Sequence, residues 1–234
     1  MLCLPGTERP WLKRLDHLIC EVGDIDEALA LFVDLGFPVA WPVGRFWPQG
    51  RTAGVALGGI NLEFLQLDDG APEVARIRTL VFEPFDLRAA ATRLADLGLD
   101  VRIAEKWESD AQLLQLRGFQ GEDLKTPQLL CTNAYLTGEI PVDFFLCDYA
   151  PKLRSILSPS NFPHVPPIAR VVLGVPDLAS AWAILSQLYG LPVAHGGVEI
   201  GLREKPCEFP EVVEIVSDRG PIDLKGWAAR FTLV

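Results

Sequence analysis

Three stretches of the chain share one pattern of apolar and polar positions. Each begins with a short apolar run, and each run ends near an aspartate: Asp24, Asp86 or Asp177. After each aspartate, apolar residues recur every three or four positions, which is the spacing of one face of an α-helix. An aspartate can accept hydrogen bonds from the free N–H groups of a first helical turn. The pattern therefore predicts a buried strand, a cap and an amphipathic helix three times over.

The predicted helices also end alike. Gly36, Gly98 and Gly190 follow the capping aspartates by 12, 12 and 13 residues. Glycine readily takes the left-handed conformation that terminates a helix, and the start of another strand follows each of the three. Three such coincidences in register indicate an internal repeat.

A last strand is predicted to close each repeat, and each of these strands has one carboxylate among apolar neighbours. The three carboxylates are Glu63, Asp143 and Glu214. The sequence therefore predicts an α+β fold of repeated βαβββ modules, two fuller ones and a shorter third of βαβ type. Their boundaries are residues 14–70, 75–150 and 166–234.

Acidic residues outnumber basic ones, with 31 Asp and Glu against 21 Lys and Arg and a formal net charge of −10. This excess repels phosphate backbones and anionic lipids, so it argues against binding to nucleic acid or to membranes. No apolar run is long enough to span a bilayer, and the first residues lack the apolar centre of a signal peptide. The five cysteines show no CxxC spacing. Together these features predict a cytoplasmic protein without a disulfide framework.

The first module has a distinctive order of motifs: a strand, a capped helix that ends in Leu-Gly-Phe, and a last strand with a glutamate. The residues are Leu15–Leu18, Asp24, Leu35–Phe37 and Leu62–Leu65. This order resembles the vicinal oxygen chelate superfamily, which has the fold of glyoxalases, bleomycin-resistance proteins and extradiol dioxygenases. The proline-rich connector before the third segment is similar to that of glyoxalase-like domain proteins. The general pattern covers most of residues 14–216, and its specificity comes from the order and repetition of the motifs.

The resemblance implies that paired modules curl their mixed sheets into a cleft, with metal ligands on the first and last strands of each module. The corresponding residues here are His17 and Glu63, Thr79 and Asp143, and Arg170 and Glu214. His17, Glu63 and Asp143 would then bind a divalent metal such as Fe, Mn, Ni or Zn, with Glu63 and Asp143 as catalytic carboxylates. Thr79 departs from the pattern, because it cannot replace a second histidine.

His17 and Glu63 each allow a second interpretation. His17 equally suits a buried, hydrogen-bonded histidine, and strand alternation predicts that Asp16 points to the opposite face. Glu63 lies either in the cleft or on the solvated face of its sheet, and the histidine in the paired position favours the cleft. In the third module, Arg170 and Glu214 favour a structural ion pair.

A further cluster lies between Trp41 and Arg51, a segment predicted to be a loop between strands. Its aromatic side chains would give contact area, and its arginines would bind a carboxylate in a bidentate manner. The predicted substrate-binding residues are Arg45, Phe46, Trp47 and Arg51 of this segment, with Thr79 and Trp107 of the second module. Exposed aromatic residues are also typical of protein–protein interfaces, including those of a homodimer.

Three functions are compatible with this sequence. The first is a metal-dependent enzyme (a lyase, isomerase or dioxygenase) that acts on a small oxygenated molecule through chelation and proton transfer. The second is a metal-free protein of the same fold that sequesters or senses an aromatic or acidic small molecule, which Thr79 and the scarcity of histidines favour. The third is a structural role in which the acidic surface and Trp47 contact a partner. The sequence leaves open which modules pair to form the cleft.

Overall fold

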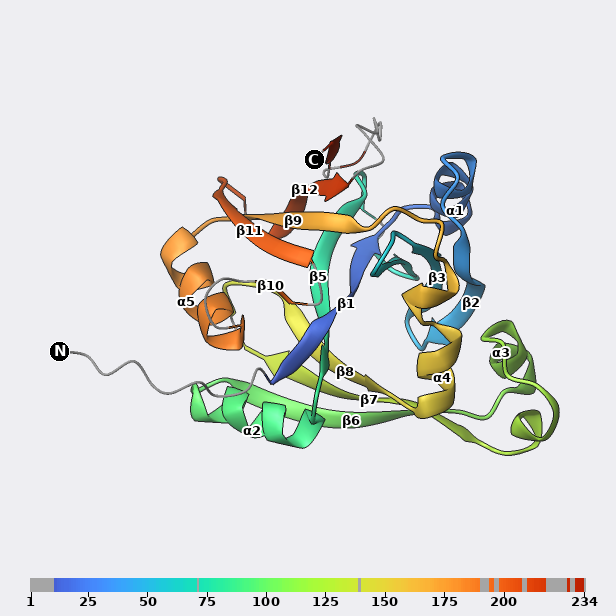
Figure 1. Ribbon diagram of the computed structural model, residues 1–234. Helices are drawn as coiled ribbons and strands as arrows, with labels where there is room; N and C mark the ends of the chain where they lie inside the picture. Colours follow the sequence, from blue (N-terminus) through green and yellow to red (C-terminus); the bar gives the residue numbers. More distant parts are fainter. Residues whose placement is uncertain are drawn as a thin grey trace.

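The computed structural model describes residues 11–70, 72–138, 140–189, 194–195, 198–207, 210–217, 227 and 230–233. These residues form an eight-stranded sheet and a five-stranded sheet (Figure 1). The first module contains β1 (Leu12–Glu21), α1 (Ile25–Asp34), β2 (Val39–Trp47), β3 (Gly50–Ala56) and β4 (Asn61–Leu67). The second contains β5 (Arg76–Pro84), α2 (Leu87–Asp96), β6 (Asp100–Glu108), α3 (Ala111–Leu116), the 3-10 helix η1 (Gly121–Lys125), β7 (Gln128–Thr137) and β8 (Phe144–Tyr149).

The first two modules join edge to edge in one sheet. Its strand order is β2-β3-β4-β1-β5-β8-β7-β6. In each module the first strand is parallel to the last, β1 to β4 and β5 to β8, while β1 and β5 are antiparallel across the junction. The prediction of an α+β fold with curled mixed sheets and repeated βαβββ modules is confirmed.

The helix caps lie where the sequence predicts them. Asp24 accepts hydrogen bonds from the backbone N–H groups of Asp26 and Glu27, and Asp86 and Asp177 cap α2 and α5 (Leu178–Tyr189) in the same way. Gly36 and Gly98 have φ values of 80° and 84° at the helix ends, whereas Gly190 lies outside the described residues. None of the helices in the described ranges is long and apolar enough to cross a membrane.

A connector with α4 (Pro151–Ile156) and the 3-10 helix η2 (Pro159–Asn161) leads to the second sheet. That sheet contains β9 (Ile168–Val175), β10 (Ala194–His195), β11 (Val198–Glu204), β12 (Glu211–Ser217) and β13 (Arg230–Leu233), in the order β10-β11-β9-β12-β13. The parallel neighbour of β9 is β11, and β12 is antiparallel to β9. The closing strands β4 and β8 are parallel to the first strands of their modules, whereas β12, which contains Glu214, is not. The prediction that the Glu214 strand corresponds to these closing strands is therefore wrong, because the pattern of apolar residues does not encode strand direction.

The predicted ion pair between Arg170 and Glu214 is wrong for the same reason. Arg170 lies opposite Glu199 of β11, and the two side chains are 3.1 Å apart. Glu214 instead pairs with Arg203 at 2.7 Å. Both pairs are partly exposed, so they add little to stability.

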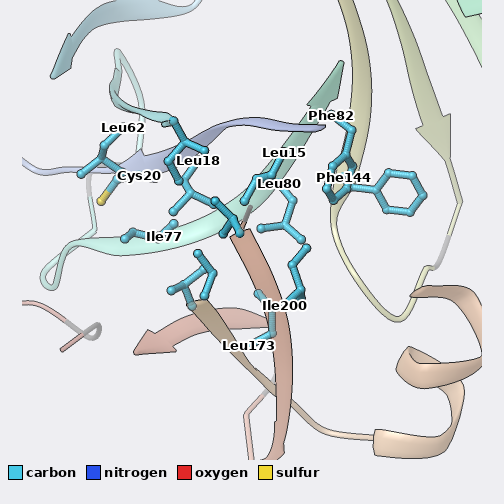
Figure 2. Close-up of a cluster of buried hydrophobic side chains, with 14 of the residues drawn as sticks. Leu15, Leu18, Cys20, Leu62, Ile77, Leu80, Phe82, Phe144, Leu173 and Ile200 are labelled. Atoms are coloured by element: carbon cyan, nitrogen blue, oxygen red, sulfur yellow. The ribbon is translucent and has the colours of Figure 1, made fainter. Parts of the chain in front are cut away.

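The five-stranded sheet covers one face of the eight-stranded sheet. Apolar side chains of β1 and β5, such as Leu18 and Leu80, face Leu173 of β9 and Ile200 of β11 (Figure 2). Helices α1 and α2 add their buried faces to the same core, including the fully buried Phe32. The third module therefore packs as an extra layer, and the first two modules provide the cleft on the opposite face.

A smaller apolar cluster lies on that opposite face. It includes Ile19 of β1, Leu65 of β4 and Val81 of β5. Residues 109–127 connect β6 to β7 and are called the excursion below, and their apolar side chains, such as Leu114 and Phe119, belong to the same cluster. The long charged excursion therefore folds back over the cleft, with its apolar side chains inward.

The turn between β3 and β4 holds the end of the connector in place, just before the connector enters the second sheet. Gly58 and Gly59 have φ values of 82° and 83°, and the carbonyl of Gly58 accepts a hydrogen bond from the N–H of Ile168 at 3.1 Å. A Cβ atom on Gly58 would collide with the backbone carbonyl of Pro166, whereas a Cβ atom on Gly59 would meet nothing within 4 Å.

These two glycines make a matched pair of variants. Gly59→Ala should lower the free energy of unfolding by about 1–2 kcal/mol, the cost of a left-handed alanine. Gly58→Ala carries the same strain and must also displace the connector, so we expect roughly 1–3 kcal/mol more. Urea denaturation of both variants measures the difference, and equal losses would contradict the proposed anchoring role of this turn.

Candidate functional site

A bulge in β1 places Asp16 beside His17. Leu15 pairs with Phe82 of β5 and His17 pairs with Val81, so Asp16 is an extra residue in the ladder. The bulge breaks the strict alternation of side chains. Asp16 Oδ2 therefore lies 2.8 Å from His17 Nδ1, and both side chains are buried. The prediction that these residues point to opposite faces is wrong.

His17 is held between two carboxylates. Its Nδ1 atom donates to Asp16, and its Nε2 atom lies 3.3 Å from Glu63 Oε2. Burial disfavours the imidazolium, but the bonds to Asp16 and Glu63 outweigh burial and raise the pKa of His17 to about 9. His17 is therefore a cation at neutral pH. The hydroxyl of Tyr149 lies 3.4 Å from Nδ1.

Glu63 of β4 lies on the cleft face and is 7% exposed. Burial raises the pKa of this carboxyl, but the His17 bond and the positive charges of Arg117 and Lys106 together lower it below its usual value. Glu63 is therefore an anion surrounded by cationic groups, and the structure brings it together with His17 as the sequence predicts.

The position in the second module that is equivalent to Glu63 holds Phe145. Ile19 and Val81 each lie five residues before the aspartate that caps the following helix. Ile19 pairs with Glu63, and Val81 pairs with Phe145, not with Asp143. The sequence alignment of Asp143 with Glu63 is therefore two residues out of register, because both carboxylates have apolar neighbours.

Asp143 is exposed and lies in the outer part of the cleft. It accepts a hydrogen bond of 2.5 Å from the hydroxyl of Thr79. Both residues line the larger of two cavities on this face, called the outer cleft below. Neither residue lines the smaller cavity, called the inner chamber, which is lined by His17 and Glu63. The three residues predicted to hold a metal are therefore divided between two places.

Arg117 is the residue that follows α3, and the excursion carries it into the site. Its guanidinium lies 3.9 Å from the centre of the Phe46 ring and 5.8 Å from that of Trp41. The side chain is 7% exposed, and its Nε atom has no hydrogen-bond partner. Among the described residues, no carboxylate lies within ion-pair distance of it. Burial lowers the pKa of Arg117 and Glu63 opposes this effect, yet a guanidinium stays charged at neutral pH.

Lys106 of β6 is the third cation. Its Nζ atom lies 5.1 Å from the centre of the Trp47 ring, and no salt bridge to it occurs among the described residues. Burial and the neighbouring Arg117 lower the pKa of Lys106, and the Glu63 carboxylate only partly offsets them. The amine is thus poorly stabilised as an ammonium.

Two neighbouring cavities lie on this face. The outer cleft has a volume of about 930 Å³, and the inner chamber has one of about 40 Å³. Trp47, Lys106 and Phe145 line both, so they lie at the boundary between them. His17, Glu63, Arg117, Asn133, Tyr149 and the thiols of Cys131 and Cys147 line the inner chamber.

The predicted loop from Trp41 to Arg51 is wrong, because β2 extends to Trp47 and β3 begins at Gly50. Phe46 and Trp47 reach the site. Arg45 reaches only the outer cleft, where it forms a bidentate pair with Asp68 at 2.8 Å.

The two other predicted substrate contacts lie apart from the chamber. Arg51 lines neither cavity and instead binds Gln66 and Asp26, at 2.7 and 3.2 Å. Trp107 lines the outer cleft, is 56% exposed, and donates its indole N–H to Glu105 at 2.9 Å.

The sequence predictions missed three charged residues: Lys106 and Arg117, which line the chamber, and Asp16, which contacts His17 from behind. Asp16 was hidden by a bulge that alternation cannot reveal. Lys106 and Arg117 belong to a segment whose charges are typical of a solvated loop. The one available signal was the apolar spacing of Leu113, Leu114 and Phe119 around Arg117, which is typical of a segment that packs on the protein.

The chamber residues do not fit a metal ion. Among the described residues, no three His, Cys, Asp or Glu side chains are grouped as metal ligands would be. His17 and Glu63 bring two such side chains together, whereas Asp16 lies at the other ring nitrogen of His17, where it would orient a ligand and not act as one. Arg117 and Lys106 also bring positive charge to the place where a metal cation would lie.

Comparisons with known proteins bear on the fold. No protein-family model matches the sequence, and no curated protein matches it. Among solved structures, a hypothetical protein from Staphylococcus aureus matches with a TM-score of 0.63 and 10% identity, over 94% of this chain and 99% of that chain. A mutant of 4-hydroxymandelate synthase from Streptomyces coelicolor matches with a TM-score of 0.59 and 15% identity, over 88% and 71%. Homoprotocatechuate 2,3-dioxygenase from Arthrobacter globiformis matches with a TM-score of 0.50 and 12% identity, over 91% and 65%.

The chain thus has the vicinal oxygen chelate, or glyoxalase-like, fold. At these identities the comparisons establish the fold and its cleft, and the chemistry must be argued from the side chains of this chain.

The raised pKa of His17 predicts how stability depends on pH. The folded state binds the His17 proton more tightly than the unfolded chain, whose histidine pKa is 6.5. The resulting stabilisation is fully present below about pH 6.5 and is lost as the pH rises through about 9. Its size is on the order of 3 kcal/mol. Urea denaturation between pH 6 and pH 9.5 should show this loss, and His17→Gln should largely abolish it. A parent protein equally stable at both ends of this range would refute the assignment.

Proposed function

We propose that this protein binds a small organic anion, a carboxylate with a flat apolar body, in the cleft without a metal. The observation that carries the proposal is the buried guanidinium of Arg117, which has no anionic partner within ion-pair distance in the part of the chain that the structure describes. An arginine withdrawn from water needs a partner to offset its desolvation. A carboxylate is the simplest one, since its two oxygens match the guanidinium in a bidentate pair.

The charges around the chamber favour an anion. His17, Arg117 and, when protonated, Lys106 are positive, and Glu63 is the one carboxylate among the chamber-lining residues. Asp16 lies behind His17, and its charge is offset by an ion pair with Arg14. The whole chain has a net charge of −10, whereas the residues that line this chamber carry two positive charges, or three when Lys106 is protonated, against one negative charge.

The sizes of the two cavities suggest how the ligand would be oriented. A chamber of about 40 Å³ admits a group about as large as a carboxylate or one or two water molecules. The body of the ligand would lie in the outer cleft, against Trp47, Tyr135 and Phe145. Aromatic walls with a few polar groups at one end are typical of small-molecule sites.

Aromatic acids are suitable first probes. The names of two proteins with similar structures, 4-hydroxymandelate synthase and homoprotocatechuate 2,3-dioxygenase, refer to aromatic acids. We would use isothermal titration calorimetry with phenylacetate, 4-hydroxyphenylacetate and phenylpyruvate. Phenylacetamide, a neutral molecule of similar shape, is the matched ligand control.

Arg117→Gln should weaken carboxylate binding roughly 10- to 100-fold, because one charge-assisted bidentate contact is lost. Arg88→Gln removes a positive charge from an exposed position of α2 and should leave the affinity unchanged. Addition of a chelator should change nothing. Equal affinity for the acids and the amide, or no effect of Arg117→Gln, would exclude the proposed anion site.

A metal-dependent enzyme is the second candidate function. One observation favours it: His17 and Glu63 lie 3.3 Å apart at the positions where the superfamily has its ligands in the first module. Elemental analysis of the purified parent, His17→Ala and Glu63→Ala tests it after incubation with iron, manganese, nickel or zinc. We expect less than 0.1 equivalents of metal, roughly a trace level, because the chamber is already cationic. Near-stoichiometric metal that both variants lose would overturn the metal-free proposal.

A further inference from the structure

We propose that Lys106 captures a carbonyl group of the bound anion as an imine, so that the ligand class is a 2-oxo acid. This inference rests on the proposed binding of the carboxylate by Arg117, and it adds a covalent step at a neighbouring residue. A 2-oxo acid places its carbonyl carbon one bond from the carboxylate, and the two groups would therefore meet neighbouring cations.

The position of Lys106 carries this inference. Its side chain lines both the outer cleft and the inner chamber, so it lies within reach of a ligand in either cavity. The amine lies over the Trp47 ring and has no carboxylate partner within 4 Å among the described residues. Arg117 lines the same chamber. The two acidic residues nearest to Lys106 on β6 are engaged elsewhere, since Glu105 accepts from Trp107 and Glu108 from the backbone N–H groups of Ser109 and Asp110.

The electrostatic surroundings favour the free amine that such a reaction needs. A lysine becomes nucleophilic when burial or a second cation disfavours its ammonium form. Both influences act on Lys106 and lower its pKa, burial first and Arg117 second. Lys13 differs from Lys106, because its amine lies 2.9 Å from the carboxylate of Glu83, which favours the ammonium form.

The reaction is balanced without an oxidant or a reductant. The nitrogen lone pair of Lys106 attacks the carbonyl carbon, and the carbonyl π electrons move to the oxygen, which takes up a proton. Loss of the nitrogen proton and departure of the protonated oxygen as water give the C=N bond. His17 lines the same chamber as an imidazolium and would supply the proton for the departing oxygen. Glu63, which contacts His17, would receive the proton released by nitrogen.

Reductive trapping tests this step. The parent protein is incubated with phenylpyruvate and sodium cyanoborohydride at neutral pH, and the intact mass is measured. A trapped imine adds the mass of the ligand, less one water and plus two hydrogens. We expect one adduct per chain, assigned to Lys106 by peptide mapping. Phenylacetate, which has no ketone, should give none.

Lys106→Arg keeps the charge but removes the primary amine, so it should lose the adduct and bind phenylpyruvate more weakly than the parent, because the imine no longer contributes to the affinity. Lys125→Arg, at an exposed position, is the matched control and should react like the parent. Calorimetry on every variant separates binding from trapping.

Three outcomes would overturn the inference. One is tight binding of phenylpyruvate with no adduct, which leaves the anion site intact. Another is an adduct that persists in Lys106→Arg or is spread evenly over the lysines. The third is the absence of phenylpyruvate binding, and if phenylacetate also fails to bind, the proposed function fails as well.

Discussion

The structure depends on the antiparallel pairing of β1 with β5. This pairing joins two modules, each of which would otherwise leave its first strand as an open edge, into one eight-stranded sheet. It gives the sheet one face for the apolar core shared with β9 and β11, and one face for the cleft. The same pairing contains the bulge at Asp16, which sets a carboxylate against His17. The pairing that joins the two modules therefore also holds His17 in its charged form.

The sequence predicted the framework well because its signals are local and repeated. The capping aspartates, the terminating glycines and the apolar runs correctly placed the first strand and the following helix of the first two modules. Gly190 of the third module lies outside the described residues. The direction of β12 could not be predicted, since an apolar run with a single carboxylate fits a parallel or an antiparallel strand equally well. The register of Asp143 was missed for a related reason: two residues along a strand return to the same face.

The candidate site was predicted only in part. His17 and Glu63 meet as the repeat suggested, because corresponding strand positions of one module converge on the cleft. The cations that decide the chemistry come from elsewhere: Lys106 from an edge strand and Arg117 from the excursion between β6 and β7. No repeat constrains these positions, and their contacts join residues distant in sequence, such as Phe46 and Arg117. Only the three-dimensional arrangement shows that the cleft of this fold has cationic side chains at its centre.

The origin of Arg117 in an excursion has a consequence for how this cleft could be altered. The strands that hold the sheet together and the segment that sets the polarity of the chamber are separate parts of the chain. A redesign could shorten or recharge residues 109–127 without changing the ladder between β1 and β5. The contribution of Arg117 can thus be changed separately from the scaffold, and exchange of this one segment would alter the charge of the chamber while His17 and Lys106 stay in place.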